Sequence, residues 1–441
     1  MEEKDQDLEK KTSQDFDFMK ERIKERPLNK KKLIRRTIIT ASMAVIFGLV
    51  ACLTVLLLEP LLSNWLYPEA PPQNVTFPQE TQEISPEDMA LDDEELKEEP
   101  DLEEIRQEIV NNLDDRDDLE RLEATYGRLG ELTDEVSRSL VTVTGVTSDM
   151  DWFDNTYESS GQTSGVIVAD NGREYLVLVN KGPIETVESI KVTFCDGTNA
   201  DALVKKADPI TGLAILSVEK KKIQDMTQRE IGIVMLGSSN GADLVGSPVI
   251  ALGSPVGTGG SVMYGMVTSA GSVLHTVDSR YKLITTDMYG SGKGTGILVN
   301  LNGQLVGVIN QNYNSKDMSN AVCAIGISEL KKTIERLSNG KNQVYLGIYG
   351  TDVTVDAHEK LRVPYGTYVT EIVMDSPAMK AGIQSGDVIV SMDGRNISTY
   401  QDYIEVLREL IPGNTGTLTV MRQTQEEYKS MQLQVVWEEL E

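Results

Sequence analysis

A glycine-dense loop between two apolar runs is the part of this sequence whose residues could most directly do chemistry. Gly290–Gly296 holds four glycines in seven residues, together with the polar side chains of Ser291 and Lys293. Glycine adopts backbone angles that other residues resist, so such a loop can turn several N–H groups toward one point. Convergent N–H groups form oxyanion holes and anion-binding nests, although plain turns share this composition. A Ser–Lys pair would add a nucleophile only if the lysine were desolvated, and nothing in this loop predicts that.

Strands on both sides are predicted to position the loop. Lys282–Thr286 enters it, and Gly296–Asn300 leaves it. The chain then turns at Asn302–Gly303 and returns as Gln304–Ile309. Because Asn and Gly both tolerate positive φ, Asn-Gly between apolar runs is a strong hairpin signal.

The remaining candidates for metal or nucleophilic chemistry are few. The histidines, His275 and His358, have no His or Cys partner nearby, and the three cysteines lie far apart. We therefore expect no metal, no cofactor and no disulfide framework, with Cys52, Cys195 and Cys323 as buried free thiols. His275 precedes the glycine loop and stays open as a catalytic base.

Length and charge bound the class of protein. The chain has 441 residues, 40% of them hydrophobic, which is enough for two or three domains. Its net charge of −27 is concentrated between Glu80 and Glu120, a stretch that contains 19 acidic and 3 basic residues. An acidic chain argues against nucleic-acid partners, whose phosphates need Lys and Arg.

The N-terminal region predicts a membrane anchor. Thr37–Leu58 is a run of 22 uncharged residues, long enough as a helix (about 33 Å) to cross a bilayer core of about 30 Å. The basic stretch before it favours a cytoplasmic N-terminus and an extracytoplasmic remainder. A cleaved signal peptide is the alternative, disfavoured by the long leader and the lack of a clear cleavage site.

Between the anchor and the β-rich region, an acidic tether is followed by a helical pattern. Tyr67–Pro100 is too polar to fold alone. Asp101–Ser139 has apolar residues at helical spacing in two sets whose phase slips: Leu102, Ile105 and Ile109, then Leu119, Leu122, Tyr126, Leu129 and Val136. A helix packed on its own domain or a solvated stalk is favoured over a short coiled coil.

From Ser139 onward, short Val/Ile/Leu strands alternate with Gly, Asn and Asp turns, a pattern typical of a sandwich or barrel. The region resembles the trypsin-like peptidase of the HtrA family of serine proteases. That family's active-site strand enters through Thr-Asp and leaves as Pro-Leu-Val-Asn-x-x-Gly-x-Val-x-Gly, with Ile297 here in place of the proline. The matching residues here are Thr286, Asp287, Leu298, Val299, Asn300, Gly303, Val306 and Gly307. The resemblance implies a double β-barrel, so the fold class we expect is mostly β.

The same resemblance places glycine at all three catalytic positions. A trypsin-like site needs a serine, a histidine and an aspartate. The family's serine falls on Gly294, its histidine on Gly182 (or on Lys181 with a one-residue shift) and its aspartate on Gly212. This favours a pseudoprotease without proteolytic activity, while a serine endopeptidase with non-standard catalytic residues is the alternative.

Val344–Trp437 resembles the PDZ domain that follows the protease in the HtrA family. Asp375-Ser376-Pro377-Ala378 and Gly386-Asp387-Val388-Ile389 carry the resemblance. A PDZ domain binds a peptide C-terminus by presenting loop N–H groups to the carboxylate and a strand edge to the backbone. The expected peptide-binding residues are Tyr345, Leu346, Gly347, Ile348, Tyr403 and Leu407. A PDZ domain that only packs against its neighbour is the alternative.

Together these patterns predict five regions: a cytoplasmic tail (1–36), a transmembrane helix (37–58), a tether and stalk (59–134), a protease-like domain (135–340) and a PDZ domain (341–441). The expected function is binding of peptides or protein C-termini outside the cytoplasm, in scaffolding or regulating protein quality control. Expected partners are such peptides, the membrane, and a second copy or an active HtrA relative.

Overall fold

The computed structural model describes residues 39, 41–50, 54, 72–78, 115–150, 156–314, 320–425 and 427–440. Residues 1–71 form one unit and residues 72–441 a second, compact one. In the first unit, residues 41–50 are helical and exposed. Within these described ranges, no helix is both long enough and apolar enough to cross a membrane. The segment 37–58 lies partly outside them, so the anchor stays a prediction.

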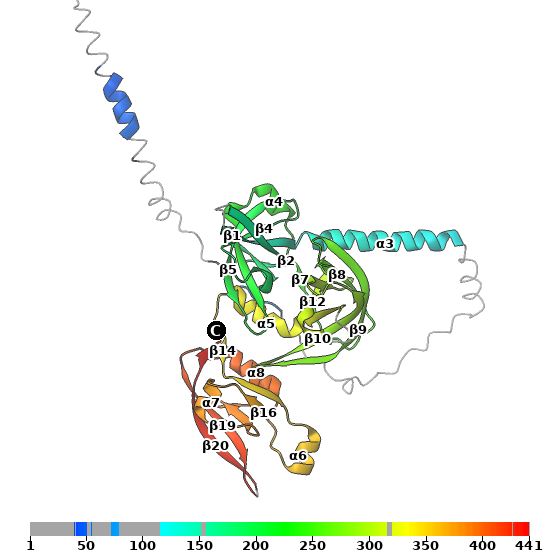
Figure 1. Ribbon diagram of the computed structural model, residues 1–441, viewed down its shortest axis with the longest axis vertical. Coiled ribbons are helices and arrows are strands. Elements are labelled where there is room, and N and C mark those ends of the chain that lie inside the picture. The colour runs from blue at the N-terminus through cyan, green and yellow to red at the C-terminus, as the bar shows by residue number, and fades with distance from the viewer. Residues whose placement is uncertain are drawn as a thin grey trace, which may run out of the picture. The chain divides into compact units, whose positions relative to one another are not determined.

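Helix α3 (Asp115–Ser137) leads into the β-rich domain. Its C-terminal end packs on that domain, since Val136 is buried there and Leu129 and Leu132 are partly buried. Figure 1 shows the rest of the helix extending away from the barrels, and three apolar side chains on it are exposed: Leu119, Leu122 and Tyr126. The other predicted set, residues 102–109, lies outside the described residues.

The first β-barrel is closed, with strand order β1-β2-β3-β6-β5-β4. Its interior is filled by β-branched and aliphatic side chains such as Val143, Val177, Val192 and Leu216, all fully buried, which suit a pleated sheet with one buried face. Helix α4 (Asp225–Glu230) follows the barrel. The strands are β1 (Leu140–Met150), β2 (Thr156–Asp170), β3 (Glu174–Asn180), β4 (Ser189–Thr193), β5 (Asn199–Ala207) and β6 (Leu213–Glu219).

The second sheet has seven strands in the order β11-β8-β9-β10-β13-β12-β7, and an additional β11–β12 pairing closes it into a barrel. Its β9–β10 hairpin is longer than the sequence predicted: β9 continues to Thr276 instead of ending at Ser269. The strands are β7 (Met235–Leu236), β8 (Pro248–Ser254), β9 (Ser261–Thr276), β10 (Ser279–Tyr289), β11 (Thr295–Val299), β12 (Gln304–Asn310) and β13 (Ala321–Gly326).

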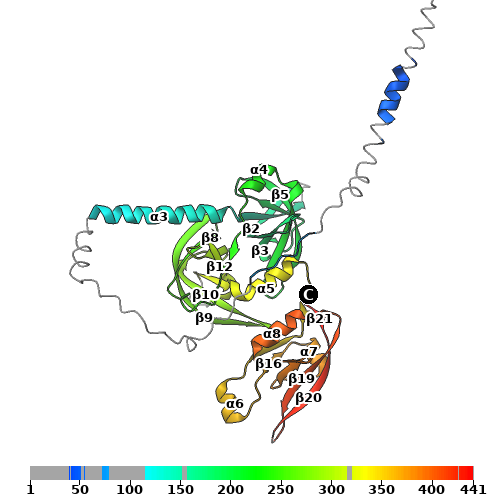
Figure 2. The same ribbon diagram turned by 180° about the vertical axis from the view of Figure 1, so that it is seen from behind.

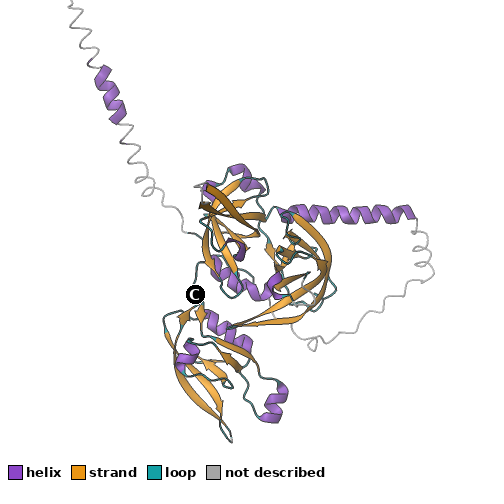
Figure 3. Ribbon diagram, viewed as in Figure 1, coloured by secondary structure: helices purple, strands orange, loops and turns teal. Residues whose placement is uncertain are grey.

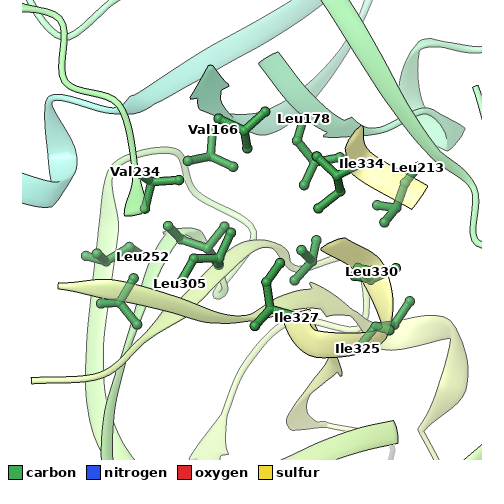
Figure 4. Packing of buried hydrophobic residues seen from close by; sticks show 14 of the residues in the cluster. Val166, Leu178, Leu213, Val234, Leu252, Leu305, Ile325, Ile327, Leu330 and Ile334 are labelled. Atoms are coloured by element: carbon green, nitrogen blue, oxygen red, sulfur yellow. The ribbon is translucent and has the colours of Figure 1, made fainter. Parts of the chain in front are cut away.

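A shared core joins the two barrels. Figure 4 shows Val166, Leu178 and Leu213 of the first barrel facing Leu252, Leu305 and Ile325 of the second, with Ile327, Leu330 and Ile334 of helix α5 (Ile327–Ser338) beside them. All nine side chains are buried. Helix α5 therefore fixes the two barrels against each other, and the glycine loop lies between β10 and β11.

The last domain has a five-stranded path, β15-β16-β17-β19-β20, with β15 at the edge. Helix α8 begins at a capping box formed by Thr399 and Asp402, a strong N-terminal signal. Figures 2 and 3 show its helices α6, α7 and α8 around the sheet. The elements are β14 (Val344–Tyr345), β15 (Ile348–Asp352), α6 (Val355–Leu361), β16 (Thr367–Ile372), α7 (Pro377–Ala381), β17 (Val388–Met392), β18 (Arg395–Asn396), α8 (Tyr400–Glu409), β19 (Thr415–Gln423), β20 (Tyr428–Val436) and β21 (Glu438–Glu439).

Candidate functional site

Backbone hydrogen bonds hold the glycine loop to the β8–β9 turn. The N–H of Ser291 donates to the carbonyl oxygen of Pro255 at 2.9 Å, and the N–H of Gly294 donates to the carbonyl oxygen of Ser291 at 2.8 Å. The side-chain amide of Gln311 also donates to the Ser291 carbonyl, at 3.2 Å. With the N–H groups of Gly290 and Lys293, which donate to the Asn320 carbonyl and the Ser291 hydroxyl, at least four of the loop's N–H groups have partners within the protein.

Gly294 has no room for a side chain. A Cβ built on it would lie 2.4 Å from the Pro255 carbonyl oxygen and 3.0 Å from that of Ser291. Both are backbone atoms, so a serine here requires the β8–β9 turn to move.

The other two glycines assigned to catalytic positions lie against one side chain, that of Asn180. Its Oδ1 accepts the N–H of Gly182 at 3.1 Å. Cβ atoms built on Gly182 and Gly212 would lie 3.4 and 4.0 Å from that oxygen. Asn180 also lines a small cavity between the barrels with Thr295, the residue after Gly294. The fold thus brings all three positions to the seam between the barrels, and Asn180 is a polar residue there that sequence reasoning missed.

A buried carboxylate shapes the turn before Gly212. Asp208 is 2% exposed, and its side chain accepts the Thr211 hydroxyl at 2.6 Å and the Ile210 N–H at 3.2 Å. Gly212 has φ +71°, which glycine adopts without strain. The hydrogen bonds of Asp208 account for the Asp-Pro-Ile-Thr-Gly sequence as a turn.

Neither histidine lies at the glycine loop. His275 pairs with Arg280 near the tip of the β9–β10 hairpin, whereas the loop follows the other end of β10. His358 belongs to α6 and stacks on Tyr365 with ring centroids 3.9 Å apart. The geometry therefore does not support the open possibility that His275 serves as the catalytic base of this loop.

The serine, lysine and cysteine candidates differ in their surroundings. Lys293 is exposed, and its backbone N–H donates to the Ser291 hydroxyl at 3.2 Å, so the desolvated lysine that a dyad needs is not provided.

Cys323 is buried, and burial raises the pKa of its thiol to about 11. Cys195 is exposed, so the prediction that it is buried was wrong. Cys52 lies outside the described residues.

The predicted carboxylate-binding loop holds a carboxylate. The N–H groups of Leu346, Gly347 and Ile348 donate to the side chain of Asp278 at 2.8, 2.7 and 3.1 Å. The Tyr403 hydroxyl donates to the same carboxylate at 2.6 Å. Asp278 lies at the tip of the β9–β10 hairpin and is 2% exposed. Sequence reasoning missed it, because no local pattern links position 278 to position 347.

Opposing influences act on the Asp278 carboxyl. The pKa is raised above its ordinary value, because burial outweighs the hydrogen bonds from Tyr403 and from the Gly347, Ile348 and Leu346 N–H groups, which act to lower it. Burial also raises the pKa of Tyr403 well above its usual range, and the Asp278 charge adds to that shift. Tyr403 therefore stays protonated and acts as a hydrogen-bond donor.

Gly347 is required by both its backbone angle and its neighbours. Its φ is +89°, and a Cβ built on it would lie 2.3 Å from the Ser376 Cβ and 2.9 Å from the Tyr345 hydroxyl. Leu407 is 3% exposed and packs in the core of this domain, so it does not line an open groove in this conformation. Of the six predicted peptide-binding residues, four contact the Asp278 carboxylate directly: Leu346, Gly347, Ile348 and Tyr403.

Comparisons with known proteins identify both domains. A trypsin-like peptidase domain matches residues 163–308, and a PDZ domain matches residues 332–434. The periplasmic serine endoprotease DegP of Escherichia coli K12 is 30% identical over 279 residues, 62% of this chain and 56% of that protein. DegP of Salmonella typhimurium is 32% identical over 244 residues, 54% of this chain and 49% of that protein. The chain thus spans about half the length of the curated relatives it matches.

A solved structure supports the fold. The HtrA-type protease AlgW with a decapeptide aligns with a TM-score of 0.52 at 20% identity, over 70% of this chain and 98% of that one. The predicted double β-barrel followed by a PDZ domain is confirmed.

The relatives correct one prediction. The sequence favoured a protein without enzymatic activity, because three glycines stood at the aligned catalytic positions. Proteins about 30% identical to this chain are named serine endoproteases, which points to a protease. The physical reason is that catalytic groups are defined by their geometry and roles, so missing side chains at three aligned positions do not exclude a site built from others.

Proposed function

We propose that this chain, which carries a trypsin-like peptidase domain followed by a PDZ domain in the HtrA arrangement, binds peptides or protein C-termini through its PDZ domain. The proposed binding residues are Tyr345, Leu346, Gly347 and Ile348 at the loop and Tyr403 on α8, whereas the predicted Leu407 packs in the core of this domain. The peptidase domain carries the PDZ domain, and the two together act as a scaffold for protein quality control outside the cytoplasm.

The observation that carries the proposal is the carboxylate held by three consecutive N–H groups. The loop donors lie 2.7 to 3.1 Å from the oxygens of Asp278, the geometry that a terminal carboxylate requires. The adjacent strand β15 is at the edge of its sheet, where a peptide backbone can add as a further strand. Both parts of C-terminal recognition are therefore supported by the described residues.

The expected affinity is micromolar, about −8 kcal/mol, because a few peptide residues bury little area and must be ordered on binding. The test measures binding of a decapeptide library with randomised last residues, prepared with free carboxylates and as C-terminal amides. Amidation removes the charged acceptor, so we expect binding to weaken by about tenfold or more. Gly347→Val should weaken it as much, since the Cβ would contact Ser376.

Gly394→Val is the matched control. Gly394 has φ +78° but nothing within 4 Å of a built Cβ, so this variant carries similar backbone strain without altering the loop. Binding that is indifferent to amidation would reject the carboxylate site and favour a PDZ domain that serves as a packing element.

A second candidate function is peptide-bond hydrolysis with non-standard catalytic residues, and the names of the relatives favour it. The assignment of Gly182, Gly212 and Gly294 to the triad positions remains our proposal. Under it, Ser291 is the candidate nucleophile, because the loop's other hydroxyl, that of Thr295, is buried and accepts the N–H of Ser164 at 3.1 Å. Labelling of the wild-type chain by a fluorophosphonate probe, lost in Ser291→Ala, would support this candidate. An unlabelled chain that also leaves casein intact would reject it.

The proposal includes one membrane anchor at 37–58, with the tail 1–36 in the cytoplasm and the tether 59–134, the domain 135–340 and the domain 341–441 outside. The uncharged run and the basic residues before it support this topology, as does the periplasmic location in the relatives' names. Protease added to spheroplasts should remove the chain beyond Pro60. Full protection of both domains would reject it.

A further inference from the structure

The tip of the β9–β10 hairpin, Val277–Arg280, lies where a peptide ligand is proposed to bind. Figure 1 shows this hairpin reaching from the second barrel toward α8. Besides offering its carboxylate to the loop, Asp278 donates its own N–H to the carbonyl oxygen of Ile348 at 2.8 Å. Ile348 begins β15, so this bond is of the kind that an added strand makes with a PDZ domain.

The hairpin tip also contacts both walls of the predicted groove. On β15, Asp352 forms an ion pair with Arg280, with the Nη1–Oδ2 distance at 2.6 Å. On α8, the Tyr400 hydroxyl donates to the Ser279 carbonyl at 3.5 Å, in addition to the Tyr403 bond to Asp278. The tip thus reproduces, within one chain, the carboxylate contact and the strand-edge contact of a bound peptide.

We propose that Asp278 is an internal ligand of the PDZ domain, which must leave the carboxylate-binding loop before a peptide C-terminus can enter. The inference rests on the proposed peptide-binding function and adds its regulation. Each N–H of Leu346, Gly347 and Ile348 is a single donor, so the loop cannot satisfy two carboxylates at once. Two like charges in a buried site would also repel each other.

Competition of this kind lowers the apparent affinity for a peptide. The apparent dissociation constant equals the intrinsic one divided by the fraction of molecules whose loop is open. If the loop is open in about one molecule in ten, the apparent dissociation constant is about tenfold larger than that of the open form. Removing the internal carboxylate should therefore lower the apparent dissociation constant for a peptide by about that tenfold factor.

The experiment compares the full-length wild type with Asp278→Asn. Asparagine keeps the size of the side chain but turns an NH₂ donor toward N–H groups that need an acceptor. We expect the variant to bind the free-carboxylate library about tenfold or more tightly than the wild type, with the amide library unchanged. We also expect faster hydrogen exchange at the amides of residues 346–348 in the variant without peptide.

Asp201→Asn is the matched control, because Asp201 is an exposed carboxylate on β5 of the first barrel. It should change neither readout. If Asp278→Asn does not fold, Arg280→Ala serves in its place. It loses the ion pair with Asp352 and should tighten carboxylate binding by up to about fivefold.

The outcomes separate the two claims. Equal carboxylate-dependent binding by wild type and Asp278→Asn would overturn the internal ligand and leave the proposed function standing. Faster exchange at residues 346–348 without carboxylate-dependent binding in any variant would instead reject the peptide-binding function, and Asp278 would then be a structural contact only.

Discussion

Gly292 and Gly294 belong to the same loop but differ in the space around them. A Cβ on Gly294 would lie 2.4 Å from the Pro255 carbonyl oxygen, whereas one on Gly292 would have nothing within 4 Å. Neither has a positive φ, so the difference between them is steric. The loop conformation therefore depends on glycine at position 294 and not at position 292.

Replacing each glycine by serine tests this difference. Because the contact is with a backbone oxygen that must move, Gly294→Ser should lower the free energy of unfolding by about 1–3 kcal/mol. Gly292→Ser should change it by less than about 0.5 kcal/mol. Urea denaturation followed by fluorescence measures both. Equal stability of the two variants would show that the turn at Pro255 adapts freely.

Gly347 and Asp278 differ in how far the sequence alone could identify them. Gly347 could be singled out from the sequence, because its motif requires a glycine. The structure adds the physical reason for a glycine there, which is the nearby Ser376 side chain and a φ of +89°. Asp278 could not be found at all, because its partners lie between 68 and 125 residues away in sequence and come together with it only after folding.

At the scale of elements, local patterns predicted strands and turns well. The hairpin between β11 and β12 forms at Asn302–Gly303, where the sequence placed it. The length of β9 was underestimated, because residues 270–276 are half polar and much of that stretch is exposed. They are ordered by pairing with β10 and by contacts of the hairpin tip with β15, and such non-local contacts leave no period in the sequence.

In the first barrel, an ion pair joins two strands that are not neighbours. Lys205 on β5 and Glu174 on β3 are separated by β6, and their side chains meet with Nζ and Oε2 2.7 Å apart. Burial pushes the pKa of Glu174 up, but hydrogen bonds from Lys205 and Asn171 and the nearby positive charges outweigh it and hold the pKa below its ordinary value of 4.5. Ionised Glu174 is thus favoured in the folded barrel.

This shift predicts a pH-dependent effect of Glu174→Gln. Since the folded pKa is lowered, the stabilisation is present above the ordinary value of 4.5 and is lost as the pH falls through the folded value. We expect the variant to be less stable by up to about 1 kcal/mol at pH 7, with the difference shrinking below that range. Denaturant unfolding at several pH values measures it, and Glu188→Gln is the exposed control. A difference that grows on acidification would contradict this account.

At the scale of the whole molecule, the peptidase and PDZ domains are joined by contacts of two kinds. One is the buried contact of Asp278 with the loop and with Tyr403. The other is a set of more exposed ion pairs, such as Lys206 with Glu439 at 2.9 Å. Exposed pairs contribute little because water and salt screen them. Replacing one oxygen of the buried carboxylate by an NH₂ group leaves hydrogen-bond donors of the loop without an acceptor, which costs much more.

In Asp278→Asn, the two domains should therefore unfold in separate thermal transitions. In Lys206→Ala, they should still unfold in a single transition. Calorimetry of the full-length wild type should show one transition that includes both domains. In Asp278→Asn we expect a separate PDZ transition lower by about 4 °C or more, because a loss of about 1 kcal/mol or more shifts a domain of this size by that amount. Lys206→Ala should shift the melting temperature by less than about 2 °C. If Lys206→Ala separates the transitions as Asp278→Asn does, then the surface ion pairs join the domains and the hairpin tip is only one contact among several.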